Sequence, residues 1–496
     1  MINVEKMKSI AAVRGNSPCV VDHKTSYTWN QIIAKANMRV AFLKTICNKQ
    51  QLQTACYLSH NSVDVICWLS AFSTLGIQAN GLDYSLPVDK LATLIRKISP
   101  SILLVSFNLY SQKELNQLAS TGVTLLAVDA PTDPVIDAIG EVHVPEIDSL
   151  MREHRPAPFR AVSLTSGTSG LPKIALRYRS FDSRRFTWFT NRYSFNNNDG
   201  FMLMLPLYHA AGNGWARMFM GLGSTLYLVD QNDEKFISYI LSLDRVTASV
   251  MTPNLVGKIT QIVRSEKIIT HLRWVLVGGS YFSVKNKQAA IAALGPVFYE
   301  YYGCTESGVN VLSEPEDIIL HPDSVGRPFD GNQVLILDEA CNSVEVGESG
   351  RVAIASYMLM DEYGDGSKPF VSINNENYFL MADYGYLDHE NRLFLMNRNG
   401  DSWNHQNVYG IEENIRTLPC ITDVAVISLI ENGKPQLKCV FSTSHKENVE
   451  KLINKIKEKT SIYNITNFKL RAVEKIPYSP SGKVRFNEII SILNAA

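Results

Sequence analysis

The sequence Ala55-Cys-Tyr-Leu-Ser59 is followed closely by Val63-Asp-Val-Ile-Cys-Trp-Leu-Ser-Ala-Phe72. The first run has the length and apolar character of a strand, and the second is typical of a helix. The same alternation continues along the chain, with strands expected at residues 101–107, 123–128 and 274–277 and a helix at 285–293. It predicts a layered α/β fold with two α/β subdomains and largely parallel sheets up to about residue 320.

The pattern changes in the last third of the chain. Residues 321–396 contain short strands separated by turns, which predicts a small β-barrel or β-sheet subdomain. A polar break at 399–407 precedes a compact α+β segment, with strands expected at 423–429 and 436–442 and a basic helix at 447–459. We therefore predict a domain boundary near 399–401, between an N-terminal domain over 1–398 and a small domain over 402–496.

The length and composition of the chain exclude several classes of protein. A chain of 496 residues is too long for one compact core, so two or three domains are expected. The 48 basic residues balance the 48 acidic ones, so no overall charge favours nucleic acid or anionic lipid. No apolar run approaches the roughly 20 residues that span a bilayer, and the N-terminus lacks the pattern of a signal peptide. The eight cysteines are scattered without a CxxC pair, which is typical of a reducing compartment. We expect a soluble cytoplasmic protein.

The first chemical signal is Leu164-Thr-Ser-Gly-Thr-Ser-Gly-Leu-Pro-Lys173. Its glycines let the backbone approach a phosphate, its backbone N–H and hydroxyl groups can donate to phosphate oxygens, and Lys173 supplies charge. It is not the P-loop of common NTPases, because Leu171 and Pro172 separate Gly170 from the lysine. A Ser/Gly-rich surface turn is the alternative interpretation of these ten residues.

The loop resembles the signature loop of the adenylate-forming superfamily, which includes acyl-CoA synthetases, peptide-synthetase adenylation domains and firefly luciferase. Five further regions occur in that family's order: Leu205-Pro-Leu-Tyr-His209, Val277-Gly-Gly-Ser280, Tyr302-Gly-Cys-Thr-Glu306, Met381-Ala-Asp383 with Asn397-Arg398, and Pro477-Tyr-Ser-Pro-Ser-Gly-Lys-Val-Arg485. This resemblance covers nearly the whole chain. It implies that the protein joins a carboxylic acid to AMP, releases pyrophosphate, and then passes the acyl group to a thiol of coenzyme A or of a carrier protein.

The resemblance also implies roles for individual residues. The residues that contact ATP or AMP are Thr165, Ser166, Gly167, Thr168, Ser169, Gly170, Lys173, Gly278, Gly279, Ser280, Glu300, Tyr301, Tyr302, Gly303, Asp383 and Arg398. The catalytic group is Lys483, Thr305, Glu306 and His209, with Glu306 holding Mg²⁺ and His209 read as part of the pocket wall. The acid pocket is Tyr208, His209, Asn213, Gly214, Gly279, Ser280 and Gly308.

Within the implied nucleotide site, Tyr302 stacks on adenine and Asp383 accepts both ribose hydroxyls. Lys483 bridges the carboxylate and the α-phosphate, and the resemblance implies that a small mobile domain over 402–496 carries it. This domain rotates about a hinge at 399–401, where Gly400 makes rotation sterically easy. Taken singly, each of these residues is more typical of a turn cap, a surface charge or a packed side chain. Their joint occurrence in family order favours the site.

Some positions depart from the family pattern. Met381-Ala382 replaces Thr-Gly, and Glu300 stands where many relatives have Asn near the adenine amino group. Residues 402–408 contain no glycine, whereas thioester-forming relatives have one beside the pantetheine arm, so capture of the acyl-AMP by an amine is an alternative. Residues 208–218 contain no Asp to hold an α-amino group, which favours an acyl or aryl acid. A nucleotide-binding pseudoenzyme is a further alternative, against which the retained Lys483 speaks.

Overall fold

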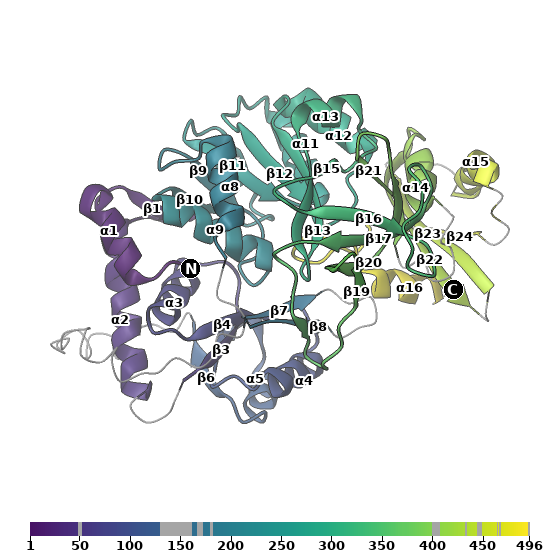
Figure 1. Cartoon of the computed structure of the whole chain (residues 1–496). Coiled ribbons are helices and arrows are strands. Elements are labelled where there is room, and N and C mark those ends of the chain that lie inside the picture. The colour runs from purple at the N-terminus through teal and green to yellow at the C-terminus, as the bar shows by residue number, and fades with distance from the viewer. Residues whose placement is uncertain are drawn as a thin grey trace. The chain divides into compact units, whose positions relative to one another are not determined.

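The computed structural model describes residues 1–47, 52–128, 161–165, 172–178, 182–398, 407–431, 434–443, 449–463, 465 and 468–494. The chain forms two compact units. The first comprises residues 1–164, 174–250 and 266–273, and the second comprises 165–173, 251–265 and 274–496. Figure 1 labels most of the helices and strands that follow. Both units mix helices and sheets, as the sequence predicts.

The first unit contains a parallel four-stranded sheet in the order β4-β3-β5-β6. Its elements are β3 (Thr54–Leu58), α3 (Val63–Thr74), β4 (Gln78–Gly81), α4 (Val88–Ile98), β5 (Ile102–Val105), η1 (Phe107–Leu109), α5 (Gln112–Ala119) and β6 (Thr124–Ala127). Leu91 and Ile95 of α4 and Leu118 of α5 pack with the buried side chains of β3 and β5, since these helices cover the sheet (Figure 1). The strands and the helix predicted between residues 55 and 128 are confirmed.

A second sheet in this unit has the strand order β11-β9-β10-β1-β2, in which only β2 is antiparallel. The strands are β1 (Pro18–Val21), β2 (Ser26–Thr28), β9 (Gly200–Leu203), β10 (Thr225–Leu228) and β11 (Val246–Met251). The helices are α1 (Val4–Arg14), α2 (Trp29–Cys47), α8 (Arg184–Tyr193), α9 (Ala210–Leu222) and α10 (Glu234–Leu241). The short strands β7 (Ala161–Thr165) and β8 (Lys173–Arg177) enclose the glycine-rich loop in sequence. Phe219 of α9 stacks on Phe201 of β9 with ring centroids 4.4 Å apart, which ties this helix to the sheet.

Asp199 immediately precedes β9 and links the start of that strand to its neighbour β11. Its carboxylate accepts hydrogen bonds from Arg273 Nε at 3.0 Å, Thr247 Oγ1 at 2.7 Å and the Asn196 backbone N–H at 2.9 Å. Burial by itself would raise the pKa of Asp199, but the bonds from these three residues hold that pKa below its usual range. The ionised carboxylate therefore favours the folded state at neutral pH.

The second unit begins with α11 (Pro253–Glu266), β12 (Trp274–Gly278), α12 (Val284–Leu294), β13 (Phe298–Cys304), β14 (Gly308–Ser313), α13 (Pro315–Leu320) and β15 (Arg327–Pro328). Strand β12 is parallel to β13, and β13, β14 and β15 pair antiparallel. Ser283 caps α12, because its hydroxyl accepts from the Asn286 backbone N–H. The strand predicted at 274–277 and the helix predicted at 285–293 are confirmed.

The β-rich segment forms an antiparallel sheet. Its members are β16 (Gln333–Leu337), β17 (Gly350–Ala355), β19 (Phe370–Ile373), β20 (Glu376–Leu387) and β21 (Leu393–Arg398), and β18 (Glu362–Tyr363) lies between β17 and β19 in sequence. Pairing follows the order β16-β17-β20-β19, with β21 on β20. Among the described residues the ladder does not return to its first strand, so this sheet is open where the sequence allowed a small barrel.

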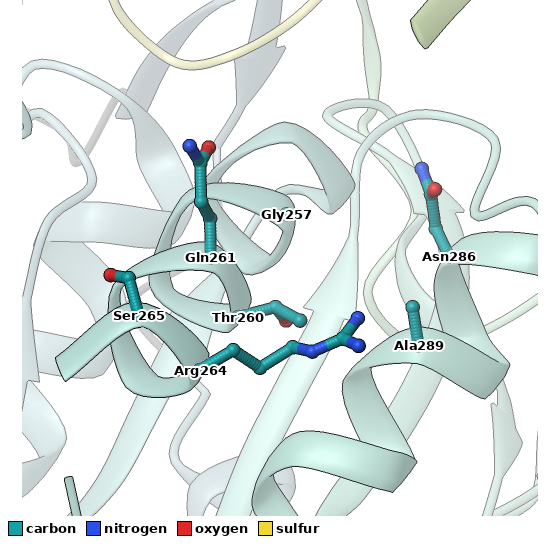
Figure 2. A pocket seen from close by; sticks show the side chains of 7 residues that line it. All are labelled: Gly257, Thr260, Gln261, Arg264, Ser265, Asn286 and Ala289. Atoms are coloured by element: carbon teal, nitrogen blue, oxygen red, sulfur yellow. The ribbon is translucent and has the colours of Figure 1, made fainter. Parts of the chain in front are cut away.

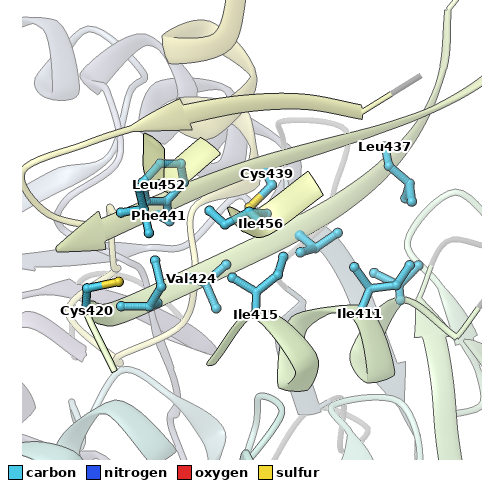
Figure 3. Packing of buried hydrophobic residues seen from close by; sticks show 12 residues of the cluster. Ile411, Ile415, Cys420, Val424, Leu437, Cys439, Phe441, Leu452 and Ile456 are labelled. Carbon is cyan, nitrogen blue, oxygen red and sulfur yellow. The ribbon is translucent and has the colours of Figure 1, made fainter. Parts of the chain in front are cut away.

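The C-terminal segment has its own core. It contains α14 (Val408–Arg416), β22 (Ile421–Glu431), β23 (Lys434–Thr443), α15 (Val449–Thr460), η2 (Ser461–Tyr463), β24 (Phe468–Ala472) and α16 (Phe486–Asn494). Figure 3 shows its buried side chains, including Ile411, Ile415, Val424, Leu437, Phe441, Leu452 and Ile456. The strands and the basic helix predicted here are confirmed. In the described part of the chain, no helix combines the length and apolarity needed to cross a membrane.

The Asp199 cluster yields a test of stability. Asp199→Asn removes the charge that Arg273 pairs with, and we expect the first unit to lose about 2–3 kcal/mol, less than a fully buried pair because Arg273 is 41% exposed. Hydrogen exchange of the β9 and β11 amides measures this locally, since a chain with two units need not unfold in one step. Asp244→Asn, at an exposed position nearby, is the control and should change exchange by no more than about 0.5 kcal/mol. Equal effects of the two substitutions would contradict this role for Asp199.

Candidate functional site

Thr305 and Glu306 lie at the tip of the β13–β14 hairpin, where Cys304 pairs with Gly308. A Cβ placed on Gly303 would lie only 1.9 Å from the carbonyl oxygen of Gly308, so the two strands can approach here only because residue 303 is glycine. The tight hairpin places both predicted catalytic residues on a rigid strand end. Sequence reasoning identified the motif but not the close backbone approach that shapes it.

The Glu306 carboxylate is buried and its oxygen Oε1 accepts a hydrogen bond from the Tyr363 hydroxyl at 2.8 Å. The backbone oxygen of the same residue accepts from the Met360 N–H at 2.7 Å. The ammonium of Lys173 lies over the Tyr363 ring, 4.8 Å from its centroid. Tyr363 is a residue that sequence reasoning missed, because it is in none of the motifs identified above and lies 57 positions from its partner.

Asp383 and Arg398 face each other as register partners on β20 and β21, with Oδ1 and Nε 3.9 Å apart. The Tyr302 hydroxyl donates to the other oxygen, Oδ2, at 2.8 Å. The negative charge of Asp383 raises the pKa of Arg398, so the guanidinium stays charged. The structure thus brings these three predicted nucleotide residues together, and the Tyr302–Asp383 bond was not expected from the sequence.

Lys483 extends from a turn in which its backbone N–H and carbonyl both bond to Ser479. Gly279 has φ of +85°, and a Cβ placed on it would lie 3.3 Å from Lys483 Cε. Burial, together with the positive charge of Arg398, lowers the pKa of Lys483 to about 8, against the opposing influence of Cys304 and Glu306. The lysine is therefore close to the residues of three other predicted motifs within the second unit.

Glu300 has a partner that the sequence did not predict. Its carboxylate lies 2.5 Å from the ammonium of Lys287, and the two side chains are 4% and 2% exposed. Lys287 also donates to the backbone oxygens of Pro322 and Ser324. Burial raises the pKa of Glu300, and the charge of Lys287 opposes that rise. The proposed contact of Glu300 with adenine stays a prediction.

Two further residues predicted to contact the nucleotide, Tyr301 and Ser280, lie in β13 and shortly after β12. Tyr301 packs against Gly278, where a Cβ would meet its ring at 2.5 Å, and burial raises the pKa of Tyr301 to about 12. Ser280 follows Gly279 directly and is partly buried.

Four predicted acid-pocket residues belong to the first unit. His209 caps α9, since its Nδ1 accepts from the Ala211 backbone N–H at 3.3 Å. The side-chain nitrogen of Asn213 donates to the Tyr57 hydroxyl at 3.5 Å, and that hydroxyl donates to the carbonyl of Leu207. Tyr208 forms an edge-to-face aromatic pair with Tyr84, and Gly214 lies one helical turn into α9. These contacts assign His209 a structural role at the start of a helix.

The remaining pocket residue, Gly308, begins β14, and Met358 fills the space beside it, with three of its atoms 3.1 Å from a Cβ placed there. Thr165, at the end of β7, is buried. The phosphate-loop residues Ser166, Gly167, Thr168, Ser169 and Gly170 and the hinge residue Gly400 lie outside the described residues.

A hollow of about 490 Å³ opens to solvent between α11 and α12. Its lining residues are Gly257, Thr260, Gln261, Arg264, Ser265, Asn286 and Ala289. Figure 2 shows the Arg264 side chain reaching from α11 toward Ala289 on α12. None of the residues predicted from the sequence lines this hollow, so it is distinct from the site described above.

Comparison with known proteins gives relatives along the full chain. The 2-succinylbenzoate–CoA ligase of Staphylococcus aureus strain MSSA476 is 22% identical over 501 residues, which cover 97% of this chain and 98% of that protein. The 2-succinylbenzoate–CoA ligase of Lactococcus lactis is 27% identical over 305 residues, 59% of this chain and 62% of that protein. The indoleacetate–CoA ligase of Aromatoleum aromaticum is 23% identical and covers 76% and 75% of the two chains.

Solved structures show the same fold. The amide bond synthetase McbA from Marinactinospora thermotolerans has a TM-score of 0.80 and 19% identity, with 99% of each chain covered. The O-succinylbenzoate coenzyme A synthetase from Bacillus subtilis, in complex with AMP, has a TM-score of 0.77 and 18% identity, with 97% of each chain covered. A family model described as AMP-binding enzyme matches residues 7–364, which is most of the chain. The protein therefore belongs to the AMP-binding enzyme family.

Proposed function

We propose that the protein activates a small carboxylic acid by adenylation and then transfers the acyl group to a thiol of coenzyme A or of a carrier-protein pantetheine. The observation that carries this proposal is the approach of Lys483 to Gly279, beside the charges of Arg398 and Glu306. A reaction at an α-phosphate builds negative charge on phosphate oxygens, and a fixed cation stabilises that charge. Membership of the AMP-binding enzyme family supports the same reaction.

In the first step, a carboxylate oxygen attacks the α-phosphorus of ATP, and the bond to the pyrophosphate oxygen breaks. The products are the acyl-AMP and pyrophosphate. In the second step, the thiol sulfur attacks the acyl carbon, the thiol proton is lost, and the bond to AMP breaks. Lys483 neutralises charge in the first step, and Thr305 donates to the α-phosphate from its place on the hairpin tip.

The nucleotide is proposed to lie between β12 and the β20–β21 pair. Asp383 accepts the ribose hydroxyls, with Tyr302 orienting its carboxylate. Thr165, Lys173 and the loop between them contact the β and γ phosphates. Glu306 contributes one carboxylate, which fits a magnesium ion held chiefly by phosphate oxygens and water. When bound, that ion offsets phosphate charge.

Residues 402–496 are proposed to act as a mobile lid about a hinge at 399–401. Within the second unit, Tyr409 of α14 stacks on Tyr281 with ring centroids 4.3 Å apart, and Glu413 accepts from the Val284 backbone N–H at 2.7 Å. These contacts support a lid position in which Lys483 reaches Gly279. The lysine must leave before a bulky acceptor enters, so transfer requires a second lid position.

The proposed substrate is an aryl or acyl acid. Ligases of 2-succinylbenzoate and of indoleacetate are among the relatives, and residues 208–218 offer no carboxylate for an α-amino group. A second candidate is capture of the acyl-AMP by an amine. The absence of glycine in the sequence of residues 402–408 and the fold shared with an amide bond synthetase favour it.

The first prediction concerns Lys483. Lys483→Ala should slow acyl-AMP formation by 10²-fold or more, about 2.7 kcal/mol of transition-state stabilisation, while ATP binding weakens little. Pyrophosphate release across a panel of 2-succinylbenzoate, indoleacetate and straight-chain fatty acids measures it. Lys475→Ala, at an exposed position of the same segment, is the matched control. Pyrophosphate release by Lys483→Ala at close to the wild-type rate would contradict the catalytic role of Lys483.

The second prediction concerns pH. The pKa of Lys483 in the free protein is lowered to about 8, so the cation is present below that pH and is lost as pH rises through it. We expect kcat/KM for pyrophosphate release to fall above pH 8, because this parameter reports groups of the free enzyme. Lys483→Arg should abolish this alkaline limb, since arginine remains charged. A limb that persists unchanged in Lys483→Arg would assign it to another group.

The third prediction concerns the acceptor. One active acid is incubated with ATP, coenzyme A and a mixture of amino acids, and the products are identified by mass spectrometry. We expect an acyl-CoA. An amide without any acyl-CoA would instead establish the second candidate.

A further inference from the structure

Tyr363 contacts one residue from each of two sequence motifs. Its hydroxyl donates to Glu306 Oε1 at 2.8 Å, and its ring lies under the ammonium of Lys173 at 4.8 Å from the centroid. The side chain is 7% exposed, so both contacts are made by a residue that is largely withdrawn from water. The phosphate-loop lysine and the hairpin glutamate, 133 positions apart in sequence (306 minus 173), thus share a single neighbour.

The backbone holds Tyr363 in place on both sides. Its N–H donates to the Ser367 carbonyl and its own carbonyl accepts from the Gly366 N–H, both at 2.9 Å. Asp365 closes this turn by accepting from the Ser367 N–H and hydroxyl. Earlier in the same segment, the Met360 N–H donates to the backbone oxygen of Glu306. The ring is therefore fixed against the hairpin at two points, unlike a surface tyrosine that samples several rotamers.

The chemistry of the two contacts differs. A tyrosine phenol is protonated at neutral pH, so the Tyr363 hydroxyl is a hydrogen-bond donor to the carboxylate. A donor on Oε1 fixes the orientation of the Glu306 carboxylate, whose two oxygens can together accept several bonds, including one from a cation. The aromatic face attracts the Lys173 ammonium electrostatically without neutralising it, so that charge remains available to a phosphate.

We propose that Tyr363 is a positioning residue that sets the Glu306 carboxylate toward the metal ion and the Lys173 ammonium toward the phosphates of the bound nucleotide. The inference rests on the proposed function and extends it to a residue that is in none of the motifs quoted from the sequence. The hydroxyl orients the carboxylate that binds the metal ion, and the ring positions the ammonium that binds the phosphates. Two substitutions can therefore separate the two roles.

The test measures nucleotide binding as well as turnover. Tyr363→Phe removes the hydroxyl and keeps the ring, and we expect binding of Mn²⁺ to the enzyme–ATP complex to weaken by about 10-fold or more, the range for loss of a group that orients a metal ligand. Calorimetric affinity for ATP in EDTA should be unchanged in this variant. Tyr363→Leu also removes the ring, and affinity for ATP in EDTA should fall about two- to fivefold, as expected for a cation–π contact.

Tyr357→Phe is the matched control. It removes a similar tyrosine–carboxylate bond, from the Tyr357 hydroxyl to Asp330 at 2.6 Å, six positions earlier in the chain. We expect it to change neither Mn²⁺ binding nor ATP affinity. The same metal defect in Tyr357→Phe would mean that Tyr363 acts only through the stability of the segment, and would overturn the proposal.

A double substitution makes the inference independent of small folding defects. In the Glu306→Gln background, Tyr363→Phe should cause no further loss of Mn²⁺ binding, because the oriented carboxylate is already absent. Additive losses would overturn the proposal, as would a folded Tyr363→Phe protein with wild-type Mn²⁺ binding. If the wild-type protein binds ATP and Mn²⁺ but releases no pyrophosphate with any acid, the proposed function fails, and the binding measurements still decide the role of Tyr363.

Discussion

The close approach of Gly303 to the carbonyl oxygen of Gly308 is the constraint on which the candidate site depends. Any side chain at residue 303 would strike that oxygen, since a Cβ would lie 1.9 Å away. The approach allows β13 and β14 to turn within a few residues, with Ser307 buried at the turn. Glu306 therefore lies at a fixed strand end, and its backbone oxygen also accepts a hydrogen bond from the Met360 N–H. A site built on such a rigid tip can position a carboxylate within the small tolerance that catalysis requires.

Local patterns in the sequence predicted most elements of the fold. Strands such as β3 and β5 and the helix α3 carry periodic apolar residues, and motif order identified residues that lie on the β13–β14 hairpin and the β20–β21 pair, but not the pairing itself. Contacts between distant residues were not predictable in the same way. The Tyr302–Asp383 and Tyr363–Glu306 bonds join residues 81 and 57 positions apart. The spacing of apolar residues within one element cannot predict partners at such distances in the sequence. The open pairing of the β-rich sheet was undetermined for the same reason, because strand length does not reveal which strands become edges.

The contacts between α14 and the chain around the start of α12 in the second unit are individually modest. Tyr409 stacks on Tyr281, Glu413 accepts from the backbone N–H at the start of α12, and Lys285 donates to the Arg416 carbonyl. Such contacts are each worth about 0.5–1.5 kcal/mol or less. Contacts of this strength suit the lid proposed for residues 402–496, because they can order Lys483 and still release it, whereas a large apolar interface would favour one position permanently.

The buried Lys287–Glu300 pair limits how the sequence can change over evolutionary time. Each member alone would leave an uncompensated charge among side chains that exclude water, a loss of about 3–5 kcal/mol. A lineage that replaces Glu300 with a neutral amide must therefore tolerate a destabilised intermediate or alter Lys287 in the same period. Lys287 also satisfies two backbone carbonyls, so its replacement has to supply donors as well as remove a charge. In proteins descended from this one, residues 287 and 300 should therefore be retained together or replaced together.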